Sequence, residues 1–194
     1  THANTLTLPA QAIWQNRSQI LMPGASVETN QIWRLLSSAQ GKLQVQVGQI
    51  ARGADQAFRL SVSANQRLEV PAQSDVTLRK LHTTQLVLVQ EDIDGRVQQA
   101  TRVQAAKALD ALFAPASLNA QLGANITAQA KATGKITSNT HFAVWAPTAH
   151  TISVCLFSNA KAKASAQLPL KRDDLSGVWH VQTQSAPAGT YYRY

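Results

Sequence analysis

The sequence is poor in cysteine, in aromatic residues and in long apolar runs. Cys155 is the single cysteine among 194 residues, which excludes an internal disulfide. It lies in an apolar segment, where a buried and unreactive thiol is expected. No run of about eighteen apolar residues occurs, so a membrane-spanning helix is excluded. Aromatic residues make up only 6% of the chain, which leaves few rings for stacking against a ligand.

Acidic residues are also scarce. Ten Asp and Glu stand against 18 Lys and Arg, which gives a net charge of +8. An excess of this kind is typical of proteins that bind nucleic acid or other anionic polymers. However, most of the basic residues are scattered singly, and aromatic residues do not alternate with them as in a nucleic-acid groove. The pattern indicates solvated surface charge and predicts no nucleic-acid partner.

No pattern of catalytic or metal-binding residues is found. Asp173 and Asp174 are adjacent on a predicted turn, so their side chains point apart and cannot act as a catalytic pair. Asp92-Ile93-Asp94-Gly95 resembles the start of a calcium loop, but the further oxygen ligands are missing and a hairpin turn is predicted instead. The five His residues lack ligand spacing. We therefore expect no catalytic residue, no metal and no cofactor in this chain.

The apolar residues that are present mostly alternate with polar ones, which favours half-buried strands. Strands are predicted in the first half at Gln11–Leu21, Gln31–Ser37, Leu43–Val47, Phe58–Val62, Leu86–Val89 and Val97–Val103. Two short helices are predicted, one over Asp75–Lys80 capped by Ser74 and one over Ala105–Phe113 ended by Pro115.

The second half contains a Gly-, Thr- and Ser-rich stretch that runs to Thr140, followed by short strands. These are predicted at His141–Trp145, Ile152–Phe157, Ala166–Leu170, Gly177–Val181 and Tyr191–Tyr194. Short strands separated by turns predict an all-β fold of two immunoglobulin-like β-sandwich domains in tandem, with domains at residues 1–114 and 119–194.

Four ordered segments of the second half carry a family resemblance. They read FAVWAPTA (Phe142–Ala149), ISVCLF (Ile152–Phe157), LPLKRDDLSGVW (Leu168–Trp179) and GTYYRY (Gly189–Tyr194). Together they resemble the carbohydrate-binding module of family forty-eight, which precedes the catalytic barrel of pullulanases, limit dextrinases, isoamylases and branching enzymes.

The first half of the chain indicates which of these enzymes the chain resembles most. Ala105–Leu112 with the preceding TRVQ resembles the junction before the module in pullulanases, and Trp14–Leu21 and Trp33–Ser37 resemble the opening strands of the β-domain there. The chain is therefore similar to the non-catalytic N-terminal region of a bacterial pullulanase-type debranching enzyme. This implies a secreted or cell-surface protein whose signal peptide is outside this chain.

The resemblance also concerns the last strand. In the family, the YYRY segment is followed by further strand residues and then by the catalytic barrel, so the second domain is expected to be truncated at Tyr194. An incomplete sheet exposes unpaired backbone groups. A homodimer through this open sheet edge is therefore a predicted partner arrangement.

The resemblance further suggests residues that contact sugar. Glycogen-binding modules stack exposed aromatic rings on glucose and use Lys and Asn for its hydroxyls, so the candidate contacts here are Trp179, Tyr191, Asn159 and Lys161. Those modules carry a stacking Trp in the turn after the strand that corresponds to ISVCLF. In this chain the turn reads Ser158-Asn159-Ala160-Lys161 and has no aromatic residue. The family-motif residues expected to be structural are Trp145, Ala146, Pro147, Gly177 and Tyr192.

Three functions remain open from the sequence. The leading hypothesis is a non-catalytic scaffold for the catalytic barrel of a parent glycoside hydrolase that cleaves α-1,6-glucosidic branch links in pullulan, starch or glycogen, with a contact to α-glucan. The alternative is a free-standing α-glucan-binding module. A second alternative is a basic protein that binds an anionic polymer.

Overall fold

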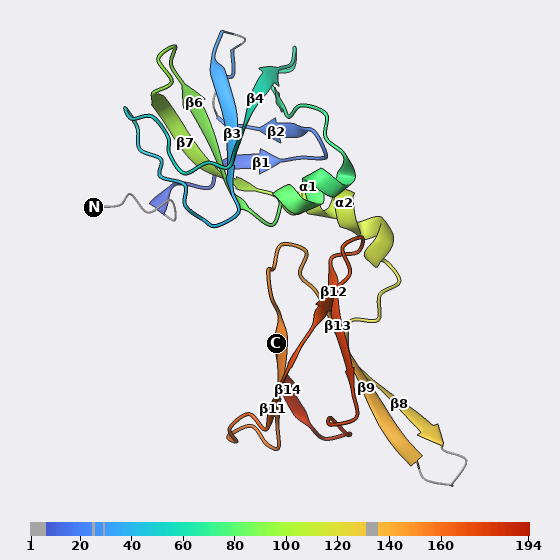
Figure 1. Cartoon of the computed structure of the whole chain (residues 1–194). Helices are drawn as coiled ribbons and strands as arrows, with labels where there is room; N and C mark the ends of the chain where they lie inside the picture. Colours follow the sequence, from blue (N-terminus) through green and yellow to red (C-terminus); the bar gives the residue numbers. More distant parts are fainter. Residues whose placement is uncertain (1–6, 25, 29, 131–135) are drawn as a thin grey trace. The chain divides into compact units, whose positions relative to one another are not determined.

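The computed structural model describes residues 7–24, 26–28, 30–130 and 136–194, and Figure 1 shows the chain. The chain forms two compact units, Thr1–Leu112 and Phe113–Tyr194, here named unit 1 and unit 2. The division lies inside helix α2 (Ala106–Ser117). The boundary predicted from the sequence lies between residues 114 and 119, in the second half of this helix and just after it.

The expected all-β fold is confirmed. Unit 1 contains β1 (Ala12–Trp14), β2 (Gln19–Leu21), β3 (Ile32–Ser38), β4 (Gln56–Val62), β5 (Leu68–Glu69), α1 (Asp75–Leu81), β6 (Gln85–Glu91) and β7 (Val97–Gln104). After α2, unit 2 contains β8 (Gly123–Ala130), β9 (Ile136–Trp145), β10 (Ser153–Phe157), β11 (Ala166–Pro169), β12 (Lys171–Arg172), β13 (Val178–Thr183) and β14 (Tyr191–Arg193).

The sheet of unit 1 closes on itself. Its strands follow the order β1-β2-β5-β4-β3-β6-β7 and form a closed β-barrel. Closure comes from a parallel pairing of β1 with β7, in which Ala12 lies opposite Val103. Two separate sheets were expected from the hairpin pattern, but local alternation does not reveal a pairing between the first and last strands of a domain. Closure leaves the sheet without free edges.

The central strands of this β-barrel are covered on both faces. Val87, Leu88 and Val89 of β6 are all fully buried, as the continuous apolar run of β6 predicted. Leu88 lies opposite Leu35 of β3. Val87 and Val89 instead belong to a second cluster with Leu43 and Val45.

Leu43–Val47 is not a strand, and this prediction was wrong. The segment makes only an isolated bridge between Gln44 and Arg52. Leu43 and Val45 are buried while Val47 is 62% exposed, so the alternation correctly identified two side chains that face the core. These two pack on the face of the sheet, where no strand edge is available for pairing.

Gln11–Leu21 contains two strands rather than the single one expected. The chain turns between β1 and β2, which pair with Trp14 opposite Ile20. The Asn16 carboxamide oxygen accepts hydrogen bonds from the backbone N–H of Ser18 at 2.9 Å and of Gln19 at 3.0 Å. An Asn side chain that satisfies the backbone in this way replaces the ladder and forms the turn.

The two helices differ from prediction only at their ends. Ser74 caps α1 as expected, because its hydroxyl accepts from the backbone N–H of Thr77 at 3.2 Å. Pro115, however, lies inside α2 and does not end it. Proline is missing only one donor, and the final turn is completed when the Leu118 N–H donates to the Ala114 carbonyl at 3.0 Å.

Unit 2 is a sandwich of two sheets, in agreement with the expected immunoglobulin-like fold. One sheet has the order β11-β10-β14 and the other β12-β13-β9-β8. Their inner faces enclose a core of Phe142, Val154, Leu156, Leu170, Trp179 and Ala186.

Strand β8 was not predicted. The sequence suggested an irregular Gly-, Thr- and Ser-rich stretch, but Gly123–Ala130 pairs with β9 along its whole length, as Figure 1 shows. β8 is an edge strand, and Ala124, Ile126 and Thr127 are exposed. A strand that buries so few side chains has no need of apolar alternation, so its sequence carries no strand signal.

Within the described ranges, no helix has the length and hydropathy required to cross a membrane.

Candidate glucan-contact surface

The outward face of the β11-β10-β14 sheet carries an exposed aromatic residue. Val154 and Leu156 of β10 point into the core, so Cys155 and Phe157 lie on the opposite face. Phe157 is opposite Tyr191 of β14, and Cys155 is opposite Arg193. Tyr191 is 54% exposed, which leaves ring surface available to a ligand.

Asn159 and Lys161 lie in the turn that follows β10. The Asn159 carboxamide oxygen accepts from the backbone N–H of Lys161 at 3.0 Å, which fixes the turn. Both side chains are exposed, and among the described residues the Asn159 amide nitrogen and the Lys161 ammonium have no hydrogen-bond or ion-pair partner. Phe157, the last residue of β10, pairs with Tyr191 of β14. The turn that begins after Phe157 therefore places Asn159 and Lys161 at the same end of the sheet as Tyr191.

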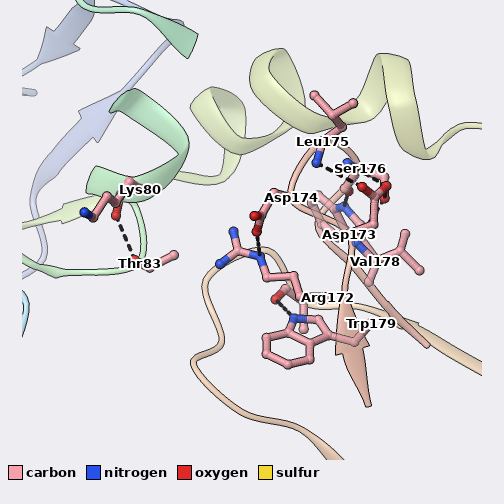
Figure 2. A network of polar contacts seen from close by, with 11 residues as sticks. Lys80, Thr83, Arg172, Asp173, Asp174, Leu175, Ser176, Val178 and Trp179 are labelled. Carbon is pink, nitrogen blue, oxygen red and sulfur yellow. Dashed lines mark hydrogen bonds and ion pairs between the residues drawn. The ribbon is translucent and has the colours of Figure 1, made fainter. Parts of the chain in front are cut away.

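Trp179 does not belong to this surface. It is only 6% exposed and is part of the core cluster of unit 2. Its indole N–H donates to the Ala146 carbonyl at 3.0 Å. Figure 2 shows the Trp179 side chain. Stacking on a sugar needs an accessible ring face, so its burial argues against the predicted sugar contact of Trp179.

The family-motif residues form an interlocked pair of segments. The Trp145 indole donates to the Ser176 carbonyl at 2.9 Å, and the Ala146 N–H donates to the Gly177 carbonyl at 3.2 Å. Gly177 has φ +68°, and a Cβ there would lie 2.6 Å from the Pro147 Cβ. Only glycine allows this approach.

The remaining tyrosines, Tyr192 and Tyr194, are 40% and 41% exposed but also make contacts with other residues of unit 2. Tyr192 packs on Phe142 with ring centroids 5.0 Å apart, and Tyr194 lies edge-on to Tyr192 at 5.6 Å. The Tyr194 hydroxyl donates to the Ala143 carbonyl at 3.1 Å. Burial raises the pKa of Tyr194 to about 12.

Phe157 and Arg193 were not singled out from the sequence as members of this surface. The signal was nonetheless present, because each is one residue away from an inward-facing neighbour, Leu156 and Tyr192 respectively. Period-two alternation around those inward-facing residues assigns Phe157 and Arg193 to the outward face.

The acidic pair Asp173-Asp174 stabilises a turn, as Figure 2 shows. The Asp173 carboxylate accepts from the backbone N–H of Leu175 and of Ser176, both at 3.2 Å, and from the Ser176 hydroxyl. The hydrogen bond from Ser176 lowers the pKa of Asp173. Asp174 instead pairs with Arg172 at 3.4 Å.

Comparison with known protein families covers nearly the whole chain. The model of the pullulanase N2 domain matches residues 9–111. The chain belongs to the pullulanase N2 family. The model of carbohydrate-binding module 48, described as the isoamylase N-terminal domain, matches residues 121–194. This N2 domain followed by module 48 is the arrangement of a pullulanase N-terminal region, as the sequence resemblance indicated.

Curated relatives of this N2–module pair are pullulanases. A pullulanase from Klebsiella pneumoniae is 30% identical over 95% of the chain, and the chloroplastic pullulanase 1 of Arabidopsis thaliana is 34% identical over 62% of it. The chain spans 17% and 11% of their respective lengths.

Solved structures of pullulanases are also similar to this chain. The apo pullulanase from Klebsiella pneumoniae superimposes on 96% of this chain with a TM-score of 0.72 and 28% identity, and the chain covers 20% of it. The same enzyme complexed with maltotriose superimposes on 96% of this chain with a TM-score of 0.72 and 27% identity, and the chain covers 18% of it.

Proposed function

We propose that this chain is the non-catalytic N-terminal region of a debranching enzyme that hydrolyses α-1,6-glucosidic links in pullulan, starch or glycogen, and that it acts as a scaffold for the catalytic barrel. The observation that carries the proposal is the match of both units together to a pullulanase structure over 96% of the chain at a TM-score of 0.72. The chain covers only 20% of that structure, which leaves room for a separate catalytic domain.

Unit 1 offers an apolar patch for such a partner. Val47, Ile50 and Ile93 are 62%, 58% and 93% exposed. A β-bridge joins Ile50 to Arg96. It holds the segment that contains Val47 and Ile50 beside the β6–β7 turn, which carries Ile93. Three exposed aliphatic residues at one end of a β-barrel favour a protein partner, and the proposed parent enzyme supplies one, its catalytic barrel.

Unit 2 provides the contact to α-glucan in this proposal. Tyr191 presents a ring for the apolar C–H face of glucose, and Asn159 and Lys161 donate hydrogen bonds to its hydroxyls. A single exposed ring predicts weak binding, suited to orienting a polymer that the catalytic barrel also holds.

Docking is tested by co-expressing the chain with the catalytic domain of its parent enzyme and measuring co-purification and thermal stability of that domain. We expect a stable complex that is weakened by Val47→Ser, Ile50→Ser and Ile93→Ser together. Val76→Ser removes another aliphatic residue, 72% exposed on α1, and serves as the matched control. A triple variant that binds as tightly as the wild type would exclude this patch as the docking surface.

Affinity electrophoresis through glycogen or pullulan tests the glucan contact. We expect modest retardation that is lost in Tyr191→Ala and largely kept in Tyr191→Phe, which preserves the ring. Ile93→Ala is the control, since it removes an exposed side chain from unit 1. Strong, Tyr191-dependent retardation would favour a free-standing binding module over the scaffold, whereas salt-sensitive retention on heparin alone would favour the basic-protein alternative.

Two further parts of the proposal concern location and assembly. We infer a secreted or cell-surface location, supported by the resemblance to bacterial pullulanases, and cell fractionation tests it. β14 pairs only with β10 among the described strands, which supports a homodimer through its other edge. Sedimentation analysis of the wild type and of Tyr192→Pro, which removes a backbone donor of this strand, tests that arrangement.

A further inference from the structure

A second candidate binding site lies on the other sheet of unit 2. An open groove of about 440 Å³ is bordered by residues 116–121, by strands β9 and β13, and by the Asp173–Ser176 turn. Its polar lining consists of Asn119, Gln121, His141, Asp173, Ser176 and His180. The volume falls within the range of roughly 300–1,000 Å³ that is usual for ligand sites.

Two histidines of this groove stack on each other. Phe142 and Trp179 point into the core, so the flanking His141 and His180 lie on the outward face. Their rings are stacked with centroids 5.9 Å apart and an interplanar angle of 28°. Ala143, which pairs with His180, is only 2% exposed and lies at the base of the groove.

The charges in the groove select a class of ligand. The chain carries an excess of basic residues, yet none of the residues that line the groove is Lys or Arg. Its single charged carboxylate, Asp173, already accepts hydrogen bonds from Leu175 and Ser176. An anionic ligand would therefore meet no Lys or Arg here and would be repelled by Asp173.

The polar groups fit a polyhydroxylated ligand. Carboxamides, imidazoles and hydroxyls offer hydrogen-bond donors and acceptors, as sugar hydroxyls do. The small side chains of Ala143 and Ala120 leave space for the apolar face of a pyranose ring. The open form of the groove suits a segment of a polymer more than an enclosed small molecule.

We propose that this groove binds a segment of α-glucan, as a contact separate from the Tyr191 surface on the opposite sheet. The proposal rests on the proposed function for the identity of the polymer. Two weak contacts on opposite faces of one sandwich would engage neighbouring glucan chains and raise overall affinity without a tight site.

The imidazole ring signals of the five histidines provide the test. The full 194-residue chain is titrated with maltohexaose while two-dimensional NMR follows each ring. We expect saturable shifts at His141 and His180, and no shift at the exposed His150, which lies outside the groove. Cellohexaose, with β-1,4 links, and inositol hexaphosphate, an anion, should shift them much less.

Variants assign the shifts to the groove. We expect His141→Ala and His180→Ala together to weaken maltohexaose binding at this site by about fivefold or more, since each lost hydrogen bond is worth close to that factor. His150→Ala is the matched control and should bind as the wild type does. Asn119→Ala and Gln121→Ala give a second pair that leaves both strands intact.

The outcomes separate this proposal from the proposed function. Glucan retardation that depends on Tyr191 without any shift at His141 or His180 overturns the groove proposal and leaves the proposed function standing. Shifts that persist in Tyr191→Ala support two independent contacts. Equal shifts with cellohexaose, or larger shifts with inositol hexaphosphate, also overturn the assignment to α-glucan.

Discussion

The imidazole of His82 packs on the indole of Trp14 in the core of unit 1, with ring centroids 4.5 Å apart and the planes tilted by 53°. His82 is 5% exposed and Trp14 is fully buried. Neither His82 nitrogen, nor the indole nitrogen of Trp14, has a hydrogen-bond partner among the described residues. Burial lowers the pKa of His82 from 6.5 to about 4.

This contact makes unit 1 sensitive to acid. A histidine whose folded pKa is lowered binds its proton more readily in the unfolded chain, so stability is lost as the pH falls below 6.5 and the loss is complete below about 4. We expect about 2 kcal/mol of this loss between pH 7 and pH 5. Urea unfolding at both pH values measures it.

The matched variant for this prediction is His82→Leu, which cannot be protonated. Its stability should depend less on pH than that of the wild type by the same amount. His150→Leu, at an exposed position, should leave the pH dependence unchanged. An identical pH dependence in wild type and His82→Leu would show that His82 is not the buried neutral group described above.

Gly177→Ala should destabilise unit 2. An added Cβ would lie 2.6 Å from the Pro147 Cβ and 3.1 Å from a ring carbon of Phe113, at a residue with φ +68°. Strain and collision together predict a loss of about 2–4 kcal/mol. Gly189→Ala is the control, because its φ of +89° is equally unfavourable but the space around it is open. In thermal unfolding, the melting temperature of Gly189→Ala should be clearly higher than that of Gly177→Ala.

Asp92→Ala should weaken the β6–β7 turn. Its carboxylate accepts from the backbone N–H of Asp94 at 3.0 Å and of Arg96 at 2.8 Å, and from the Gln98 side chain at 2.9 Å. Loss of these bonds predicts a decrease of about 1–2 kcal/mol in the stability of unit 1. Asp94→Ala removes the neighbouring carboxylate and should have little effect. If added calcium raised the melting temperature of the wild type, a metal loop rather than a hairpin turn would be indicated.

Tyr194 should titrate at unusually high pH. Desolvation and the neighbouring Tyr192 raise its pKa to about 12, while the hydrogen bond to Ala143 opposes the shift. A raised tyrosine pKa favours folding below pH 10 and that contribution is lost as the pH rises toward 12. Absorbance at the phenolate band should show a step near pH 12 that disappears in Tyr194→Phe. A wild-type curve without this step would contradict the packing described for Tyr194.

Sequence patterns located those strands that bury apolar side chains. Leu86–Val89 was identified because its continuous apolar run is covered on both faces, and Phe58–Val62 because one face is buried. Gly123–Ala130 was missed because it pairs with β9 at an exposed edge, mainly through backbone groups. Backbone pairing does not depend on side-chain identity, so such strands leave no recognisable pattern in the sequence.

Only some residues of the candidate surfaces were named from the sequence. Tyr191, Asn159 and Lys161 were identified from the resemblance, and strand register brings them to one end of a sheet. Trp179 was also named as a candidate contact, but it is only 6% exposed, because Val178 and Trp179 lie on opposite faces of β13 and both faces are covered there. The stacking of His141 on His180 depends on the register of β9 against β13, which residue spacing does not reveal.

The parallel pairing of β1 with β7 also dictates when unit 1 can fold. Ala12 finds its partner only in Val103, some ninety positions later, so a ribosome must deliver the whole of unit 1 before the ring of strands can be completed. Until then the nascent chain displays unpaired strands at both ends of the growing sheet. Long-range closure of this kind predicts slow folding and a need for protection during synthesis.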